Sequence, residues 1–568
     1  MTATPLEDLA ATVEDGDILA FGGKTIHRAP MAFVRAVARR PVENLTVIGL
    51  AKSLDVDLLC ATNQLSTIYY GYVGFEWMGL AHNFRRAIEN GNATPNEGSC
   101  YTVATMFRAA AQGVPFLPIA GMDGSELPDA IDDRLQTITC PYTEQEFLAV
   151  RAIAPDVAVI HANVADRDGN ALLIGGDLTE MLIAKAASSV YVTAEQVVDH
   201  IDFIDQGSAT HLSHAVHIPH LLVDAVAEVP YGAHPTSCPG AYEYDRAAIK
   251  RYIDISRTSE ITAHIDQMIG DDEATYRRSV VEPNRAEIRW DVETAGGRDE
   301  RTGEHDPCPD ESITVAELLC VSLARRLLAG EYRTAFQGFA SPLPTIAIRL
   351  ARAQDSSIIH LSASGAVNAA PPVMPTSTED QHLFEGASGA FTSPDCFDLA
   401  ARGDLDVMFV GSPQFDRYGR LNGSVVGDWD DPTVKFPGSG GTASLLPLIQ
   451  TGIGWRTEHS TRTLPESVDF VTASGNLAAL VTPLCQFEMI DDELQVTQLH
   501  PGVTREMVQN RTGWPVRFET TDQTPLPTDE ELDLLDQVDP SRIRRSEFSP
   551  DQLTPIGVSD GILLDDYR

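Results

Sequence analysis

The chain has 568 residues, more than a single hydrophobic core normally serves, so several domains are expected. Asp and Glu number 82 against 41 Lys and Arg, a formal net charge of −41, while 43% of the residues are hydrophobic. This composition is typical of a globular protein. A nucleic-acid partner is disfavoured, because no stretch of the sequence supplies the clustered cations that binding to a nucleic-acid backbone requires.

Lysine is scarce, since Lys24, Lys52, Lys185, Lys250 and Lys435 are the only ones in the sequence. Acidic self-repulsion strains a compact fold in dilute buffer, but at molar salt the Debye length falls to roughly 3 Å. The sequence therefore predicts a halophilic protein working in a salt-rich cytoplasm. An ordinary acidic enzyme is the alternative.

The eight cysteines are scattered without a CxxC pair, and the histidines show no metal-ligand spacing. Neither a zinc site nor a disulfide framework is indicated. The start of the chain has no basic segment before an apolar stretch, and no apolar run is long enough to span a membrane. We expect a cytoplasmic protein with no metal and no membrane partner.

Short apolar strands alternate with helical patterns from the start of the chain. Strands are expected at 18–21, 45–50 and 66–70, and a helix opened by Pro30 is expected at 30–38. Strands separated by helices indicate an α/β fold with mostly parallel sheets covered on both faces.

Two stretches of the chain resemble each other. Residues 156–172 and 406–422 each contain an apolar run followed by Asp-Arg-x-Gly-x-Leu or a close variant, and residues 20–23 resemble 335–338. The glycine supplies a positive φ in a tight turn, and the aspartate can bind adjacent backbone amides. The two pairs predict duplicated, related open α/β domains with a site between them. Coincidence among glycine turns is the alternative.

The predicted domain boundaries follow from a change of character near residue 271, where charged and glycine-bearing sequence replaces apolar periodicity. This stretch, to about residue 310, is expected to be an exposed linker. We assign one domain to residues 1–285, a charged linker to 286–310 and a second domain to 311–568.

Glycine-rich turns after apolar strands offer backbone amides for an anion. The candidates for binding a phosphate or an oxyanion are Gly22, Gly23, Gly438, Gly440 and Gly441. Their spacing is not the dinucleotide pattern GxGxxG. By this motif alone, a purely structural turn is as well supported as an anion-binding one.

Glu97 precedes a long helical pattern that includes residues 104–111. A carboxylate there can simply complement the start of the helix, which is the commoner role for glutamate at this place. No GxSxG nucleophile elbow is present, so a serine hydrolase is not favoured.

These motifs together resemble the family I CoA-transferases. Residues 108–118 with 121–125 are similar to their first subunit, and residues 416–419, 427–432 and 437–441 resemble their second. A subgroup, the two-subunit CoA hydrolases that open the last steroid rings in actinobacterial cholesterol breakdown, is matched more closely by 30–36, 69–73, 468–472, 500–504 and 512–514. The resemblance implies both subunits fused in one chain.

One departure bears on the chemistry. The resemblance implies a nucleophilic glutamate in a Ser-Glu-Asn-Gly element of the second subunit, but the corresponding residue here is Ala363. The steroid-ring hydrolases are similar in lacking it and rely on a glutamate of the first subunit. Glu97 is the candidate match for that catalyst, and Glu76 is the alternative.

The resemblance therefore implies an acyl-CoA enzyme that opens the ring of a cyclic β-oxo-acyl-CoA hydrolytically, with Glu97 as general base. Authentic CoA transfer of the acetate/3-oxoacid or glutaconate type is the first alternative, and a non-catalytic acyl-CoA binder is the second. Coenzyme A enters as part of the substrate and no permanent cofactor is expected. A homodimer of the fused chain is a further expectation.

Overall fold

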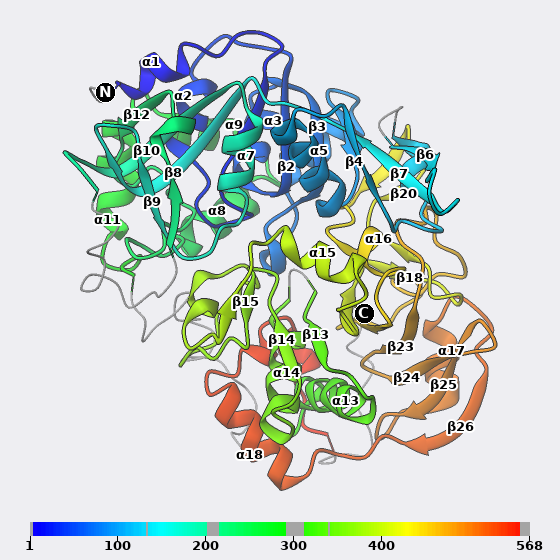
Figure 1. The fold of residues 1–568 in the computed structure, drawn as a ribbon. Helices are drawn as coiled ribbons and strands as arrows, with labels where there is room; N and C mark the ends of the chain where they lie inside the picture. The colour runs from blue at the N-terminus through cyan, green and yellow to red at the C-terminus, as the bar shows by residue number, and fades with distance from the viewer. Residues whose placement is uncertain (1–3, 132–134, 202–214, 291–311, 339–340, 557–568) are drawn as a thin grey trace.

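The structure is a computed structural model that describes residues 4–131, 135–201, 215–290, 312–338 and 341–556. Figure 1 shows two lobes, one built from residues up to 290 and the other from residue 312 onward. Each lobe has its own large sheet. The part of the predicted linker from 291 to 310 lies outside the described residues.

The sheet of the first lobe has nine strands, ordered β11-β9-β8-β1-β2-β3-β4 with β10 and β12 continuing from β8. Its strands are parallel except where β9 pairs with β8 and β11. The bounds are β1 (Ile18–Phe21), β2 (Leu45–Lys52), β3 (Leu65–Val73), β4 (Thr94–Glu97), β8 (Val157–Asp166), β9 (Ala171–Ile174), β10 (Ser189–Val198), β11 (Ala215–Ile218) and β12 (Ala225–Glu228). Its helices include α1 (Leu6–Ala10), α2 (Met31–Ala38), α3 (Leu54–Ala61), α4 (His82–Glu89), α5 (Cys100–Gln112) and α7 (Glu180–Ala186).

The sheet of the second lobe has ten strands in the order β16-β15-β14-β13-β17-β22-β23-β24-β25-β26. The five central strands, β14-β13-β17-β22-β23, are parallel to one another. The bounds are β13 (Thr334–Phe336), β14 (Ile359–Leu361), β15 (Ala366–Val367), β16 (Gly389–Ala390), β17 (Val407–Gly411), β22 (Thr451–Trp455), β23 (Leu477–Val481), β24 (Cys485–Ile490), β25 (Glu493–Leu499) and β26 (Phe518–Gln523). Its helices include α13 (Val315–Ala329), α14 (Pro342–Gln354), α15 (Asp395–Ala401), α16 (Thr442–Leu445), α17 (Arg505–Arg511) and α18 (Asp529–Val538).

The two sheets share a run of five parallel strands in the same order, which confirms the predicted duplication of mostly parallel α/β domains. The run β2-β1-β8-β10-β12 in the first lobe matches β14-β13-β17-β22-β23 in the second. The same side-chain contact fixes both copies. A carboxylate oxygen of Asp156 accepts the amide of Ile18 at 2.8 Å, and a carboxylate oxygen of Asp406 accepts the amide of Arg333 at 2.7 Å.

The repeated turns also have the predicted geometry. Gly169 has φ +105° and Gly419 has φ +71°, so each lies in the region that favours glycine. The carboxylate of Asp166 accepts the Gly169 amide at 3.0 Å, and that of Asp416 accepts the Tyr418 amide at 3.0 Å. The turns follow β8 and the equivalent strand β17.

The stretch from about residue 271 is more ordered than an exposed linker. It contains α10 (Glu273–Tyr276), a π-helical turn (Arg277–Val281) and α11 (Glu282–Asn284), which follow α8 (Arg246–Ile255) and α9 (Ile261–Ile269). Tyr276, Val281 and Ile288 are buried together in a small apolar cluster. The sequence does not indicate this cluster, because charged residues separate its members.

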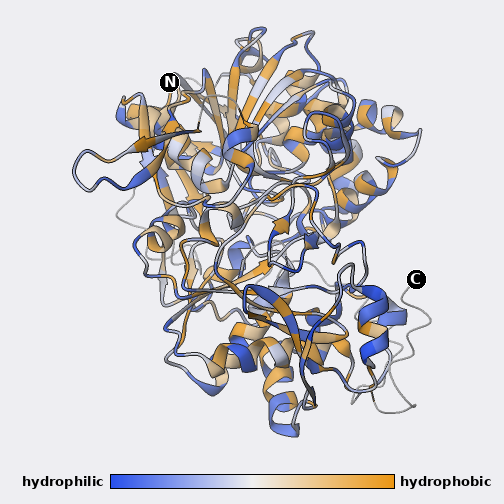
Figure 2. Cartoon of the chain, turned by 90° about the vertical axis from the view of Figure 1, so that its right-hand side faces the viewer, coloured by the Kyte–Doolittle hydropathy of each residue, from blue (hydrophilic) through white to orange (hydrophobic). Residues whose placement is uncertain are grey.

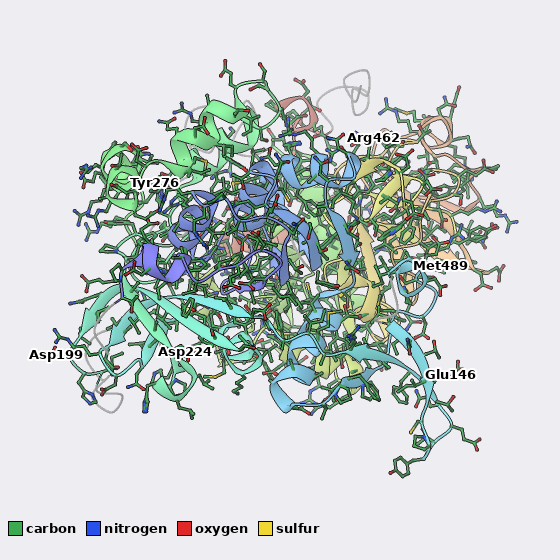
Figure 3. The ribbon with its side chains drawn as sticks, turned by 90° about the horizontal axis from the view of Figure 1, so that it is seen from above. Glu146, Asp199, Asp224, Tyr276, Arg462 and Met489 are labelled. Atoms are coloured by element: carbon green, nitrogen blue, oxygen red, sulfur yellow. The ribbon has the colours of Figure 1, made fainter. Side chains whose placement is uncertain are left out.

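Hydrophobic residues gather on the strands and on the inward faces of the helices, and polar residues cover the outside (Figure 2). A separate sheet, β5-β7-β6, is formed by Phe116–Ile119, Glu146–Arg151 and Leu135–Thr139. Glu146 on β7 lies at the edge of the molecule (Figure 3). In the described part of the chain, no helix has the length and apolar character needed to traverse a membrane.

We predict that Gly338→Ala destabilises the second lobe more than Gly403→Ala. Both glycines have positive φ, +79° and +80°, a conformation that costs alanine about 1–2 kcal/mol. An added Cβ would collide with the Phe409 carbonyl at Gly338 but would meet nothing within 4 Å at Gly403. Urea unfolding of both variants measures the difference, and equal losses would contradict the close approach of the two backbones.

Candidate active site

The two lobes meet at the carboxyl ends of their parallel strands. Lys24 lies on the loop after β1, Cys100 begins α5 just after β4, and Ala363 follows β14. In open α/β sheets this edge is the usual place for a ligand. Contacts between residues far apart in sequence show that the two edges face each other, since the Lys24 ammonium donates to the Ala363 carbonyl at 3.3 Å.

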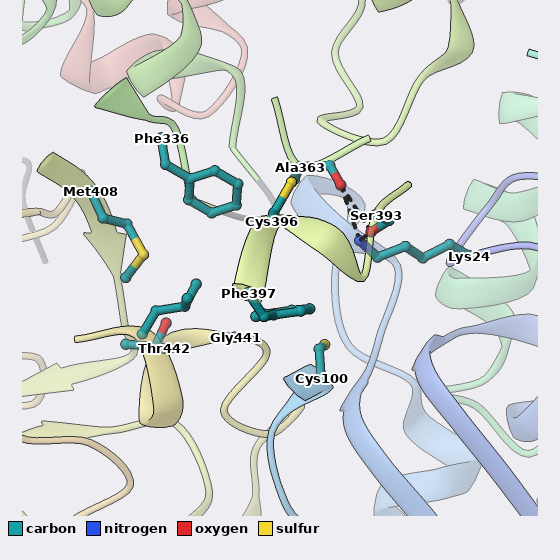
Figure 4. Close-up of a pocket in the computed structure, with 12 residues that line it drawn as sticks. Lys24, Cys100, Phe336, Ala363, Ser393, Cys396, Phe397, Met408, Gly441 and Thr442 are labelled. Atoms are coloured by element: carbon teal, nitrogen blue, oxygen red, sulfur yellow. Dashed lines mark hydrogen bonds between the residues drawn. The ribbon is translucent and has the colours of Figure 1, made fainter. Parts of the chain in front are cut away.

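A cavity of about 30 Å³ lies at this junction, room for one or two water molecules. It is lined from the first lobe by Lys24 and Cys100 and from the second by Phe336, Gly338, Ala363, Ser393, Cys396, Phe397, Met408, Gly441, Thr442 and Leu445 (Figure 4). Its walls are mostly apolar, and Lys24 is the one charged residue among them. An acyl group can enter only if the walls move apart.

Glu97 is the last residue of β4 and is fully buried between the lobes. One carboxylate oxygen accepts the Ser424 hydroxyl at 2.5 Å, and the other accepts the Tyr70 hydroxyl at 3.3 Å and the ammonium of Lys435. Burial lowers the pKa of Lys435 below its usual value, against the opposing effect of Glu97. The carboxylate therefore holds a buried cation of the other lobe.

Glu97 does not cap the helix that follows it. The Ser99 hydroxyl accepts the Thr102 amide at 3.1 Å and completes a capping box at the start of α5. The structure therefore replaces the capping interpretation of Glu97 with a contact between the lobes.

Glu97 does not itself line the cavity. Two residues near it in sequence do line the cavity. Cys100 is three residues after Glu97, and Gly441 is three residues after Gly438, which packs against Glu97. A Cβ placed on Gly438 would lie 3.4 Å from the Glu97 carboxyl carbon, so the glycine permits close packing here. The carboxylate is therefore not among the groups that line the cavity.

Four of the five predicted glycine amides are already used within the protein. The Gly22 amide donates to the Val159 carbonyl at 2.8 Å, and the Gly23 amide donates to the Glu180 carboxylate at 3.1 Å. The Gly438 amide donates to the Gly423 carbonyl at 3.0 Å, and the Gly440 amide donates to the Gly71 carbonyl at 2.8 Å. They offer no free donor to an oxyanion in this conformation. Gly441 lines the cavity.

Glu76, the alternative to Glu97, is also buried between the lobes. Its carboxylate accepts the hydroxyl of Thr25 from its own lobe, and the Ser377 hydroxyl at 2.8 Å and the Thr378 amide at 3.3 Å from the other. Burial raises its pKa, while these donors oppose the rise. The structure thus brings both candidate glutamates to the junction.

The sequence interpretation missed Lys24, Ser424, Lys435 and Glu379, which the structure also brings to this junction. The lysines carried a usable signal, because Lys24, Lys52 and Lys435 are 4%, 2% and 0% exposed in a chain with only five lysines. Where surface lysine is scarce, a retained lysine is a candidate for an interior role. The other two residues, Ser424 and Glu379, have no such signal.

The comparisons with known proteins agree on one family. A model of the family "Coenzyme A transferase" matches residues 3–229 and 338–511. The chain is 34% identical to the B subunit of 3-oxoadipate CoA-transferase from Pseudomonas knackmussii over 240 residues, which are 39% of this chain and 90% of that protein. It is 30% identical to the cholesterol ring-cleaving hydrolase IpdA subunit of Rhodococcus jostii over 262 residues, 45% of this chain and 87% of the relative.

A solved structure shows the same overall fold in one chain. The acyl-CoA transferase YdiF of Escherichia coli O157:H7, in a thioester complex with CoA, covers 92% of this chain with 94% of its own length. The TM-score is 0.63 at 15% sequence identity. The relatives that are separate subunits of two-subunit enzymes match different parts of the chain, as fused subunits require.

We predict that Glu97→Gln is strongly destabilising and that adding Lys435→Met restores most of the loss. The single change leaves a buried ammonium without its carboxylate, which typically costs about 3–5 kcal/mol, whereas removing both charges is far less costly. Urea unfolding in 2 M KCl of both variants and of Lys435→Met completes the cycle. A Glu97→Gln protein as stable as the parent would show that the pair is not formed.

Proposed function

Because this chain belongs to the coenzyme A transferase family, we propose that it is an enzyme acting on acyl-CoA thioesters, and that it uses water to open the ring of a cyclic β-oxo-acyl-CoA. Likeness to a relative named as a ring-cleaving hydrolase supports the reaction. Likeness to subunits named as CoA-transferases supports the broader class of substrate. Coenzyme A enters as part of the substrate.

The observation that carries the proposal is the methyl group of Ala363 at the cavity wall. This is the position where the sequence resemblance expects a glutamate that carries CoA. Alanine has no nucleophile, so no covalent carrier can form there. Cys100 and Cys396 also line the cavity, but burial raises the pKa of each thiol to about 12 and keeps both protonated.

We assign Glu97 the role of general base. It removes a proton from water as the water oxygen bonds to the ring carbonyl carbon, giving a tetrahedral alkoxide. Collapse of the alkoxide re-forms the carbonyl and breaks the bond to the α-carbon, whose electron pair becomes the enolate of the thioester. The proton held by Glu97 then returns to that α-carbon, so the sum of the steps is addition of one water.

The reaction needs the junction to open. The cavity as it stands holds little more than water, and the Glu97 carboxylate is engaged by Ser424 and Lys435 of the second lobe. Separation of the lobes at these contacts would admit the acyl group and expose the carboxylate together. Binding energy from the CoA part of the substrate is available to drive such a change.

Authentic CoA transfer is the competing function, and the likeness to the 3-oxoadipate CoA-transferase of Pseudomonas knackmussii favours it. In that case Glu97 would attack the thioester itself. A non-catalytic acyl-CoA binder is the third reading, favoured only by the loss of a nucleophile at Ala363.

The test is mass spectrometry of 2-oxocyclohexanecarboxyl-CoA incubated with the protein in 2 M KCl, with and without labelled acetate. We expect a CoA ester heavier by one water, no labelled acetyl-CoA and no free CoA. Labelled acetyl-CoA would establish transfer instead. Binding without any product, across a panel of cyclic and linear β-oxo-acyl-CoA esters, would support the third reading.

Glu97→Gln and the folded double variant Glu97→Gln/Lys435→Met should both lose this activity, because a general base contributes about 10²–10⁴-fold. Glu14→Gln, at an exposed position of the same lobe, is the control and should retain the parental rate. A double variant that is stable and fully active would reduce Glu97 to a structural partner of Lys435.

We also propose that the protein is adapted to molar salt. With a net charge of −41, its melting temperature should rise steeply between 0.1 and 1 M KCl, as the Debye length falls from about 10 to about 3 Å. Thermal unfolding across a KCl series measures the effect. A rise that starts only above 1 M would point to salting-out rather than charge screening.

A further inference from the structure

The loop after β1 delivers a buried lysine to the cavity. Lys24 is 4% exposed, and its ammonium lies 2.8 Å from the Ser393 hydroxyl and 3.3 Å from the Ala363 carbonyl. Figure 4 shows the side chain extending from the first lobe toward these two residues of the second. The ammonium therefore stands beside the position at which the usual carrier glutamate is missing.

The carboxylate of Glu379, from the second lobe, holds this ammonium at 2.8 Å and is itself fully buried. Burial is the largest single effect on the pKa of Lys24 and lowers it, but the charge and hydrogen bond of Glu379, together with Cys100 and Cys396, bring the pKa above its usual value. Burial also raises the pKa of Glu379 to about 7, although Lys24 opposes the rise and Glu76 adds to it. Glu76 also faces Lys24, whose charge opposes the rise in the Glu76 pKa.

The loop that carries Lys24 is held in an uncommon conformation. Thr25 has φ +48°, a left-handed value that is rare for a β-branched residue, and Arg28 has φ +53°. The Thr25 hydroxyl donates to Glu76, and the Arg28 guanidinium donates to Glu180 at 3.0 Å. Strain held by such contacts clusters at functional sites, where it fixes a group in advance of the reaction.

We infer that Lys24 is the group that binds the substrate oxygen on which negative charge develops. The inference rests on the proposed function, because that reaction places charge first on the ring carbonyl oxygen and then on the enolate oxygen of the thioester. Lys24 is the one charged residue that lines the cavity, and the rest of the wall is mostly apolar. A cation in such a setting stabilises a developing anion strongly because little water competes with it.

This assignment narrows the substrate class. The cavity that Lys24 enters is also lined by Phe336, Phe397 and Met408 (Figure 4), and by Leu445. Once the walls have moved apart, their apolar character suits an acyl group that presents one oxygen to the ammonium, which is the pattern of a β-oxo-acyl chain. Glu379 acts as a positioning residue, since it touches Lys24 and is not part of the wall.

The test compares Lys24→Met with Lys24→Arg and with Lys250→Met, a lysine that is exposed in the same lobe. We expect Lys24→Met to lower kcat in the ring-opening assay by about 10²–10³-fold, the usual loss for one oxyanion donor, with KM changed much less. Lys24→Arg should retain part of the rate and Lys250→Met all of it. A Lys24→Met enzyme within threefold of the parent kcat would overturn the inference.

A second measurement does not depend on turnover. Acetoacetyl-CoA forms an enolate with its own near-ultraviolet absorbance, and a cation at its oxygen should increase the bound enolate at a given pH. The parent should show this signal and Lys24→Met should lose it. A parent that shows the enolate but opens no ring would defeat the proposed function alone, whereas an equal signal in both proteins would defeat the role of Lys24 alone.

Glu379→Gln checks the positioning role. Without the neighbouring carboxylate the pKa of Lys24 falls, so the alkaline limb of the kcat profile should move to lower pH while activity near neutrality survives. A merely structural Glu379 would lower stability without moving that limb. If Lys24→Met fails to fold because Glu379 is left unpaired, the neutral double variant Lys24→Met/Glu379→Gln replaces it and should show the same loss of kcat.

Discussion

Buried charge at the junction of the lobes is the constraint on which the site depends. Lys24 pairs with Glu379 and Lys435 pairs with Glu97, and in each pair one partner comes from each lobe. The side chains of these pairs are 0–5% exposed. A buried ion without its partner costs several kcal/mol, so replacing one member of either pair destabilises the closed junction. The same charges that close the lobes are those that chemistry on a carbonyl would use.

The fold was accessible from the sequence because it depends on local patterns that repeat. The apolar runs and Asp-Gly turns ending at Gly169 and Gly419 correspond to equivalent strands and turns in the two sheets. The helical turns between residues 273 and 284 were not predicted, because Tyr276, Val281 and Ile288 lie too far apart among charged residues to show a helical period. Local signals predict strands and turns well, and predict sparse packing clusters poorly.

The site was less accessible because its contacts join distant positions. Glu97 stands 327 positions before Ser424, whose hydroxyl binds it, and Lys24 stands 339 positions before Ala363. No local spacing encodes such pairs. The glycine turns show a related limit, since a turn rich in glycine indicates available amides only until tertiary structure supplies acceptors, as Gly71 does for Gly440.

The duplication explains why the junction lies where it does. Each lobe carries its loops at the carboxyl ends of parallel strands, so two equivalent edges can close one cavity, with Lys24 after β1 and Phe336 at the end of the equivalent strand β13. Equivalent strands have nevertheless acquired different tasks. The first lobe supplies a lysine from its loop, while the second supplies an apolar wall and the carboxylate that keeps that lysine charged. The two similar edges have thus diverged: the first contributes the charged residue of the cavity wall, and the second contributes most of the apolar residues.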